Sequence, residues 1–486
     1  MIRTVRQSEI DFTKGGIFRK MICFSLPFLA TNFLQALYGV ADMIVVGRVV
    51  GPAGVSAIQV GGQVISLITN VAMGLAVAAT VLVAQSIGAG KQEEQNKVVG
   101  TMTVLFLLLS IAVTALLLLF KNGILRLLNT PEEVMQEAGR YLWISAAGMV
   151  FVFGYNLIGA VLRGTGDAKR PLGFVAISAA LNIALDLLFV WGMGMGAWGA
   201  AVSTVASQGA SFLLAAIYCK KAKIFDFHLN SFRMDRHTLS LVLRVGVPSG
   251  IQFSVTGLSF LALTGLANHI AGVAGSTVLG IGTRINSFGI LPCMALSSAI
   301  TAMAGQNLGA GKPERAGRAF WLGSAIAFGF SVLIFAVVSL WPEALIRLFL
   351  NMGGRGGNTQ VVEQCMALGI PYLRRISFDY LFAAAFFCAN GLANGAGQTW
   401  FTLCNSAVNA LVVRLPLAYL LTGVWLGFFD WGMNGIGTAV GFAPILSMLL
   451  GLIYAMSGHW KKAKLTIGTP QREDESKEDE TNCSHG

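Results

Sequence analysis

The sequence predicts an all-α integral membrane protein with twelve transmembrane helices in two six-helix lobes related by a parallel internal repeat. Only 12% of the residues are charged and 55% are hydrophobic, whereas soluble domains carry about 25% charged residues. The apolar runs reach the roughly 20 residues that cross a bilayer as a helix. In addition, the pattern of residues 25–91 returns at residues 246–312.

The closing run of this repeat is its most specific part. Its matching positions are Gln85 with Gln306, Gly88 with Gly309, Gly90 with Gly311 and Lys91 with Lys312. The match continues into the second part of each half, where Gly164 corresponds to Gly395. Because each half has an even number of helices, both halves enter the membrane from the same side. Such a duplication is typical of transporters, whose site lies between the lobes near the midplane.

The elements follow in order along the chain. The predicted spans are residues 21–46, 55–85, 98–120, 137–161, 171–191, 198–219, 246–270, 276–305, 318–340, 362–390, 400–423 and 435–457. The spans form an N-lobe (21–219) and a C-lobe (246–458), and the rest is a basic N-terminal segment (1–20), a linker (220–245) and an acidic tail (459–486) that we expect to be disordered. Most of the 34 Lys and Arg fall on the side of the termini, which predicts that both termini are cytoplasmic.

Several function classes have little support. The seven cysteines are scattered without a CxxC pair, so they suggest neither a disulfide framework nor a metal site. The net charge of +11 fits basic cytoplasmic loops better than a nucleic-acid partner. No HExxH or GxSxG set is present, so we expect no enzyme and no cofactor.

Charged residues inside spans are costly and therefore indicate function. Asp42 and Asp186 both reach the outer half of the N-lobe, and Asn182 shares a helix face with Asp186. Two carboxylates in one low-dielectric cavity would favour binding of a proton or Na⁺. The structural alternative is that Asp42 pairs with Arg48 and that Asp186 bonds to a neighbouring helix.

Polar residues of the C-lobe spans are weaker candidates. Asp379 follows Arg375 by four residues, so an i, i+4 ion pair is the simplest interpretation, with a cation site as the alternative. Arg284 and Arg414 also lie inside spans. Pro27, inside the first span, removes a backbone hydrogen bond, which predicts a kink that is either fixed or able to straighten.

Four stretches resemble the multidrug and toxic compound extrusion (MATE) family of transporters. They are the run from Ala41 to Gly47 around Asp42, the run from Gln306 to Lys312, the run from Leu162 to Asp167, and the pair Asn182 and Asp186. The resemblance covers roughly residues 15–460. It implies two lobes around a central cleft and export of amphipathic, often cationic compounds coupled to entry of H⁺ or Na⁺.

The resemblance also implies roles for individual residues. The cation site of the N-lobe is expected at Asp42, Asn182 and Asp186, and the supporting polar groups are Tyr141, Asn156 and Thr204. Pro27 resembles the family's kink in the first helix, and Gln35 is expected to line the cleft. The charged residues in the C-lobe spans allow a further polar site at Arg284, Arg375 and Asp379. Residues 252–256, however, lack the carboxylate that some family members carry there.

The expected partners are small amphipathic or cationic drugs and the lipid bilayer, and the expected location is a bacterial inner membrane. We expect a monomer. The first alternative is a flippase for a lipid-linked sugar, whose cleft would gather several cations for the pyrophosphate, Arg284 and Arg414 among them. The second is a membrane enzyme, for which the sequence offers no catalytic set.

Overall fold

The computed structural model describes residues 11–50, 52–128, 130, 132–225, 231–352, 359–425 and 427–462. All the regular elements in these ranges are helices. The predicted acidic tail beyond residue 462, the first ten residues and residues 226–230 of the predicted linker lie outside the described part. The start of the predicted disordered tail is wrong, because residues 459–461 form a short 3₁₀ helix in which Trp460 is buried.

The first bundle holds the six predicted spans of the N-lobe. Its helices are α1 (Ile17–Val49), α2 (Pro52–Gly88), α3 (Gln92–Leu127), α4 (Glu132–Ala147), α5 (Met149–Gly164), α6 (Lys169–Asp186) with the π-helical segment η2 (Leu187–Gly192), and α7 (Ala197–Lys221). Helices α4 and α5 form the fourth span, which bends by 48° between them. The π-helical segment begins directly after Asp186, so the helix geometry changes next to a candidate site residue.

The second bundle holds the six spans of the C-lobe. Its helices are α8 (Arg236–Gly289), α9 (Leu291–Gly309), α10 (Pro313–Leu340), α11 (Pro342–Met352), α12 (Thr359–Ile376), α13 (Phe378–Gly395), α14 (Thr399–Ala407), the π-helical η4 (Val408–Arg414), α15 (Leu415–Leu421), α16 (Met433–Phe442), α17 (Pro444–Ser457) and the short η5 (His459–Lys461). Asp235 caps α8 by accepting a hydrogen bond from the backbone N–H of Thr238 at 2.7 Å. Together with the bond from the Thr238 hydroxyl, this lowers the pKa of the Asp235 carboxyl.

The count of spans agrees with the sequence prediction. Ten helices in the described ranges are long and apolar enough to cross a membrane, and the α4–α5 pair makes eleven. Helix α8 is 54 residues long and is interrupted by non-helical dihedrals at Ala271 and Gly272. Since 54 residues exceed the length of one span and the break lies between two predicted spans, α8 holds the seventh span and the start of the eighth.

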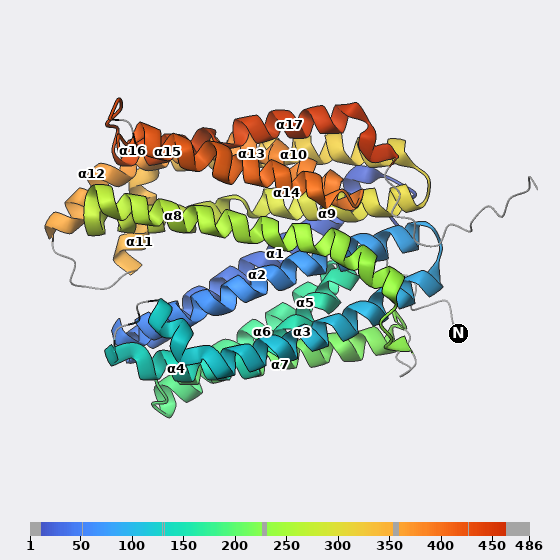
Figure 1. Cartoon of the computed structure of the whole chain (residues 1–486), viewed down its shortest axis with the longest axis horizontal. Helices are drawn as coiled ribbons and strands as arrows, with labels where there is room; N and C mark the ends of the chain where they lie inside the picture. The colour runs from blue at the N-terminus through green and yellow to red at the C-terminus, as the bar shows by residue number, and fades with distance from the viewer. Residues whose placement is uncertain are drawn as a thin grey trace, which may run out of the picture.

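The lobes lie side by side and converge at the end where α1 begins, while their ribbons separate toward the other end (Figure 1). Large apolar side chains such as Leu119 and Leu333 are exposed, and small or apolar residues fill the helix contacts. This pattern is expected where the outer surface of a bundle faces lipid.

Two glutamines join the lobes at the converging end. Gln85 Nε2 of α2 donates to the Gly395 carbonyl at 2.9 Å, and Gln306 Nε2 of α9 donates to the Gly164 carbonyl at 2.9 Å. Because Gln85 matches Gln306 and Gly164 matches Gly395 in the internal repeat, the two bonds are the same contact made in opposite directions.

Glycines allow α2 and α9 to approach closely at this end. A Cβ on Gly88 would collide with the Gln306 carbonyl, and a Cβ on Gly309 would collide with the Gln85 carbonyl. We call this contact, formed by Gln85, Gly88, Gln306 and Gly309, the glutamine–glycine crossing. It joins the two halves of the protein backbone to backbone.

Helix α1 bridges the two lobes. At its start, Met21 and Phe24 pack in the apolar cluster built by α9, α10 and α13 of the C-lobe, together with Phe12 from the preceding segment. Near its end, Val46 packs against Val190 of the N-lobe. The helix therefore belongs to the C-lobe at one end of the molecule and to the N-lobe at the other.

Candidate functional site

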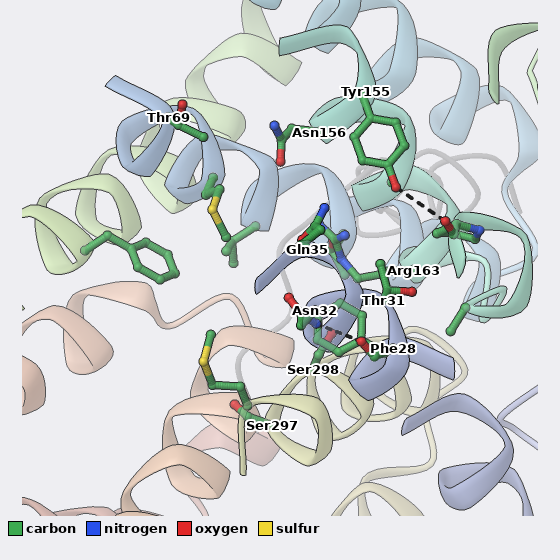
Figure 2. Close-up of a pocket in the computed structure, with 18 of the residues that line it drawn as sticks. Phe28, Thr31, Asn32, Gln35, Thr69, Tyr155, Asn156, Arg163, Ser297 and Ser298 are labelled. Carbon is green, nitrogen blue, oxygen red and sulfur yellow. Dashed lines mark hydrogen bonds between the residues drawn. The ribbon is translucent and has the colours of Figure 1, made fainter. Parts of the chain in front are cut away.

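A cavity of about 440 Å³ lies between the lobes, and we call it the central pocket. Its walls come from α1, α2, α5 and α7 of the N-lobe and from α8, α9 and α13 of the C-lobe. Figure 2 shows Gln35, Asn156 and Arg163 reaching it from the N-lobe and Ser297 and Ser298 reaching it from α9. Gln35, which the family resemblance assigned to the cleft, lines this pocket.

The pocket combines apolar and neutral polar side chains. Phenylalanine and methionine lie on both walls, and amides lie between them. The lining amides are Asn32, Gln35, Asn156, Gln208, Gln252, Asn390 and Asn394. Such a lining can cover the apolar part of a ligand, and its amides can either donate or accept hydrogen bonds. Both properties suit amphipathic ligands.

Behind the N-lobe wall the structure brings together four of the predicted site residues, which we call the acidic cluster: Asp42, Asn182, Asp186 and Thr204. Thr204 Oγ1 donates to Asp42 Oδ2 at 3.4 Å, and the side chains of Asn182 and Asp186 lie close enough to interact with the Asp42 carboxylate. Asn182 and Asp186 are fully buried.

Most polar atoms of the acidic cluster have no hydrogen-bond partner within the described part of the chain. These atoms are Asp42 Oδ1, both side-chain polar atoms of Asn182 and both carboxylate oxygens of Asp186. Buried polar groups are normally satisfied, and two carboxylates that are both charged repel each other at low dielectric. The arrangement can therefore hold a proton or a small cation.

Two further polar residues line the central pocket on the same helix faces as members of the acidic cluster. Gln208 Nε2 donates to Tyr38 Oη at 3.2 Å, and both residues line the pocket together with Thr204. Neither residue is predicted as a site residue from the sequence, although Tyr38 lies four residues before Asp42 and Gln208 lies four residues after Thr204, on the same helix faces.

The remaining N-lobe candidates lie around this centre. Tyr141 packs against Gly61 and is near enough to Asp42 to sense its charge. Asn156 lines the central pocket and donates to the Val152 carbonyl at 2.8 Å. Pro27 lies inside α1, which runs without interruption, so its predicted kink stays a prediction.

In the C-lobe, the expected ion pair between Arg375 and Asp379 is wrong. Helix α12 ends at Ile376 and α13 begins at Phe378, with a turn at Ser377 between them, and no ion pair joins the two side chains within the described part of the chain. Arg375 instead lies over the ring of Trp431 at 5.9 Å.

Asp379 faces a small cavity of about 70 Å³ within the C-lobe, together with Asn286 and Arg414. Arg414 is buried, donates to Asn409 Oδ1 at 3.2 Å and lies over the ring of Phe260 at 4.7 Å. Arg414 was recognised as a charge inside a span, but the C-lobe set expected from the sequence was Arg284, Arg375 and Asp379. Of these three, only Asp379 reaches the cavity.

The cations expected of a flippase do not gather in the central pocket. Arg284 is exposed on α8, and Arg414 lies in the separate C-lobe cavity. Among the described residues, no group of three or more His, Cys, Asp or Glu side chains is arranged to hold a metal ion.

Comparisons with known proteins agree with this architecture. The MatE family model matches residues 27–188 and 248–420, one segment in each lobe. The chain is 32% identical over 458 residues to the "Probable multidrug resistance protein YpnP" of Bacillus subtilis, covering 94% of this chain and 98% of that protein. It is 27% identical to the "Probable multidrug resistance protein NorM" of Thermotoga maritima, covering 91% of this chain and 93% of that protein. It is 25% identical to a "FAD transporter" of Shewanella oneidensis, covering 89% of this chain and 92% of that protein.

Solved structures share the fold. A crystal structure of MATE in complex with MaL6 matches with a TM-score of 0.86 at 24% identity, covering 94% of this chain and 98% of the other. An outward-facing multidrug resistance MATE family transporter matches with a TM-score of 0.85 at 24% identity, covering 93% of this chain and 98% of the other. The duplicated helical lobes, the pocket between them and these matches lead to one conclusion: the chain is a multi-pass membrane protein that belongs to the MATE family of transporters.

Proposed function

We propose that the protein is a secondary active exporter of amphipathic small molecules, cationic drugs included, which it exchanges for H⁺ or Na⁺ by alternating access. One observation carries the proposal. Thr204 lines the central pocket and also donates to Asp42 of the acidic cluster. Binding or release of an ion at the cluster can therefore change the position of a side chain in the pocket wall.

The coupling follows from unequal binding to two lobe arrangements. An ion between Asp42 and Asp186 relieves the repulsion of the two carboxylates and favours the arrangement in which they lie close together. A compound in the central pocket favours the arrangement in which both walls contact it. If the two ligands favour different arrangements, entry of one drives exit of the other.

The proposal places both termini on the cytoplasmic side of a bacterial inner membrane and takes the monomer as the working unit. The excess of Lys and Arg in the connections on that side supports this orientation. The glutamine–glycine crossing then closes the cytoplasmic end, and the pocket opens outward. The relative named as a FAD transporter suggests that the range of exported compounds extends beyond drugs.

The test is transport by the purified protein in proteoliposomes, driven first by a pH gradient and then by a Na⁺ gradient. We expect one gradient to drive accumulation of a fluorescent amphipathic drug, and we expect Asp42→Asn and Asp186→Asn each to abolish the driven part. Asn keeps the size of the side chain and removes its charge, so the two variants should keep the wild-type Tm.

Asp235→Asn is the matched control, since it removes a carboxylate at an exposed helix cap where Asn also caps well. Driven transport that survives in both Asp42→Asn and Asp186→Asn would move the coupling site elsewhere, with Asp379 as the next candidate. Drug accumulation that is the same with and without either gradient would refute the antiport.

A further inference from the structure

The central pocket carries a single formal charge among its described lining residues, and that charge is positive. The residue is Arg163, near the end of α5. The other polar lining residues are amides, hydroxyls and phenols. The nearest carboxylates, in the acidic cluster, lie behind Thr204 rather than in the wall.

Nothing in the described part of the protein neutralises this guanidinium. It makes no hydrogen bond or ion pair there, and it rests between the Phe28 ring, at 5.7 Å, and Gly159, where an added Cβ would lie 3.3 Å from Nη1. Arginine stays charged in proteins and carries five N–H donors. Arg163 is half-buried and faces the cavity, so its N–H groups are open to a ligand, and an anionic group that binds there gains charge-assisted hydrogen bonds in a site shielded from bulk water.

The obvious internal partner is occupied elsewhere. Asp167 lies four residues after Arg163, but α5 ends at Gly164, so the two do not share a continuous helix. Asp167 instead accepts from Arg170 Nη1 at 2.8 Å and from the backbone N–H groups of Lys169 and Arg170 at the start of α6. Its carboxylate is committed to capping that helix.

The internal repeat shows that the charge is specific to one wall. Asn394 corresponds to Arg163, since both directly precede the matched glycines Gly164 and Gly395, and both line the pocket. Asn394 Oδ1 accepts from Thr402 Oγ1 at 3.0 Å. The C-lobe wall therefore presents an amide that is already hydrogen-bonded, and the N-lobe wall presents a guanidinium that is not. This difference gives a bound compound a preferred orientation.

We infer that Arg163 binds an acidic group of the transported compound, a carboxylate, phosphate or sulfonate, so that the central pocket prefers amphipathic anions and zwitterions to cations of the same size. The apolar body of the compound lies against the phenylalanine and methionine side chains of the two walls. The inference rests on the proposed export function and narrows its substrate class.

The experiment compares matched fluorescent probes with the full-length protein in detergent. FMN and riboflavin share a flavin and differ by one phosphate, and carboxyfluorescein and rhodamine 110 share a xanthene and differ in charge. We expect the wild type to bind the more anionic member of each pair at least tenfold more tightly. Arg163→Gln should remove that preference, about a tenfold to hundredfold loss for FMN with riboflavin changed less than about twofold, and Arg163→Lys should keep part of it.

Arg126→Gln is the matched control, because it removes a positive charge from an exposed position at the end of α3. Equal affinity for both members of each pair, or no binding of any of the four probes, would overturn the inference. Loss of all probes in both Arg163→Gln and Arg163→Lys would also overturn it, since the arginine would then be structural. Gradient-driven transport is measured separately, so selective anion binding without ion coupling would refute the antiport and leave the role of Arg163 intact.

Discussion

Thr204 is the member of the acidic cluster that also lines the central pocket. Thr204→Val keeps the shape of the side chain and removes the donor to Asp42. A hydrogen bond to a charged group is worth about 1.5–3 kcal/mol, so we expect the apparent affinity for the coupling ion to change by about tenfold or more. The measurement is driven transport at a series of pH values or Na⁺ concentrations.

Thr204→Ser supplies the control for this prediction, because it restores the hydroxyl and should return the ion dependence to that of the wild type. An unchanged ion dependence in Thr204→Val would show that the hydroxyl takes no part in coupling, whatever the effect on drug affinity.

Residue identity alone predicted much of the acidic cluster. Charged groups inside spans are rare, so Asp42 and Asp186 were visible in the sequence, and the structure brings them together with Asn182 and Thr204. The partners of charged residues were harder to predict from the sequence. Whether Asp379 lies near Arg375 or near Arg414 depends on how distant helices pack, and an i, i+4 spacing does not show this.

The segment before α1 is an element whose contacts cross from one lobe to the other. Phe12 is fully buried in the C-lobe cluster and meets Phe24 edge to face, with ring centroids 5.7 Å apart. Its carbonyl accepts from Arg315 Nε at 2.8 Å, and its N–H donates to Gln306 Oε1 at 3.0 Å. These contacts anchor the start of α1 to the C-lobe at the converging end.

We expect Phe12→Ala to destabilise the protein by about 3 kcal/mol, since a buried ring leaves a cavity when it is truncated. The loss is measured as a lower Tm in detergent. Phe18→Ala is the matched control, because Phe18 lies on the same stretch of chain and is 58% exposed. A similar fall in Tm for both variants would mean that detergent contacts, rather than the anchor, stabilise this segment.

The apolar runs predicted where most helices lie in the chain, but they did not predict the breaks and π-helical segments within the helices. The break of α8 at Gly272 falls between two predicted spans, and all twelve spans correspond to helices. The short helix α11 was missed within a predicted connection, although the Pro at its start is a helix-start signal. The π-helical segments and the docking of residues 11–16 depend on tertiary contacts, which hydropathy does not encode.

At the scale of the whole molecule, residues that match between the two halves of the sequence make matching contacts between the two lobes. The residues that match most closely between the halves, Gln85 with Gln306 and Gly88 with Gly309, are those that form the crossing between the lobes. The sequence showed that the halves are equivalent, but it could not show that these positions meet across the pseudo-twofold axis. The proposed alternating access requires this end to open, and it therefore predicts that the crossing forms and breaks in each cycle.

Gly88→Val places a side chain where the Gln306 carbonyl lies, and it should therefore shift the population toward an arrangement in which the converging end is open. Spin labels on Glu93→Cys and Arg318→Cys, both exposed and on opposite lobes, report the opening as a longer distance in a cysteine-free background. Gly123→Val is the control, because an added Cβ there meets nothing within 4 Å. An unchanged distance distribution in a folded Gly88→Val protein would mean that α2 and α9 can slide past each other without separating, and the crossing would then be a packing contact rather than the gate.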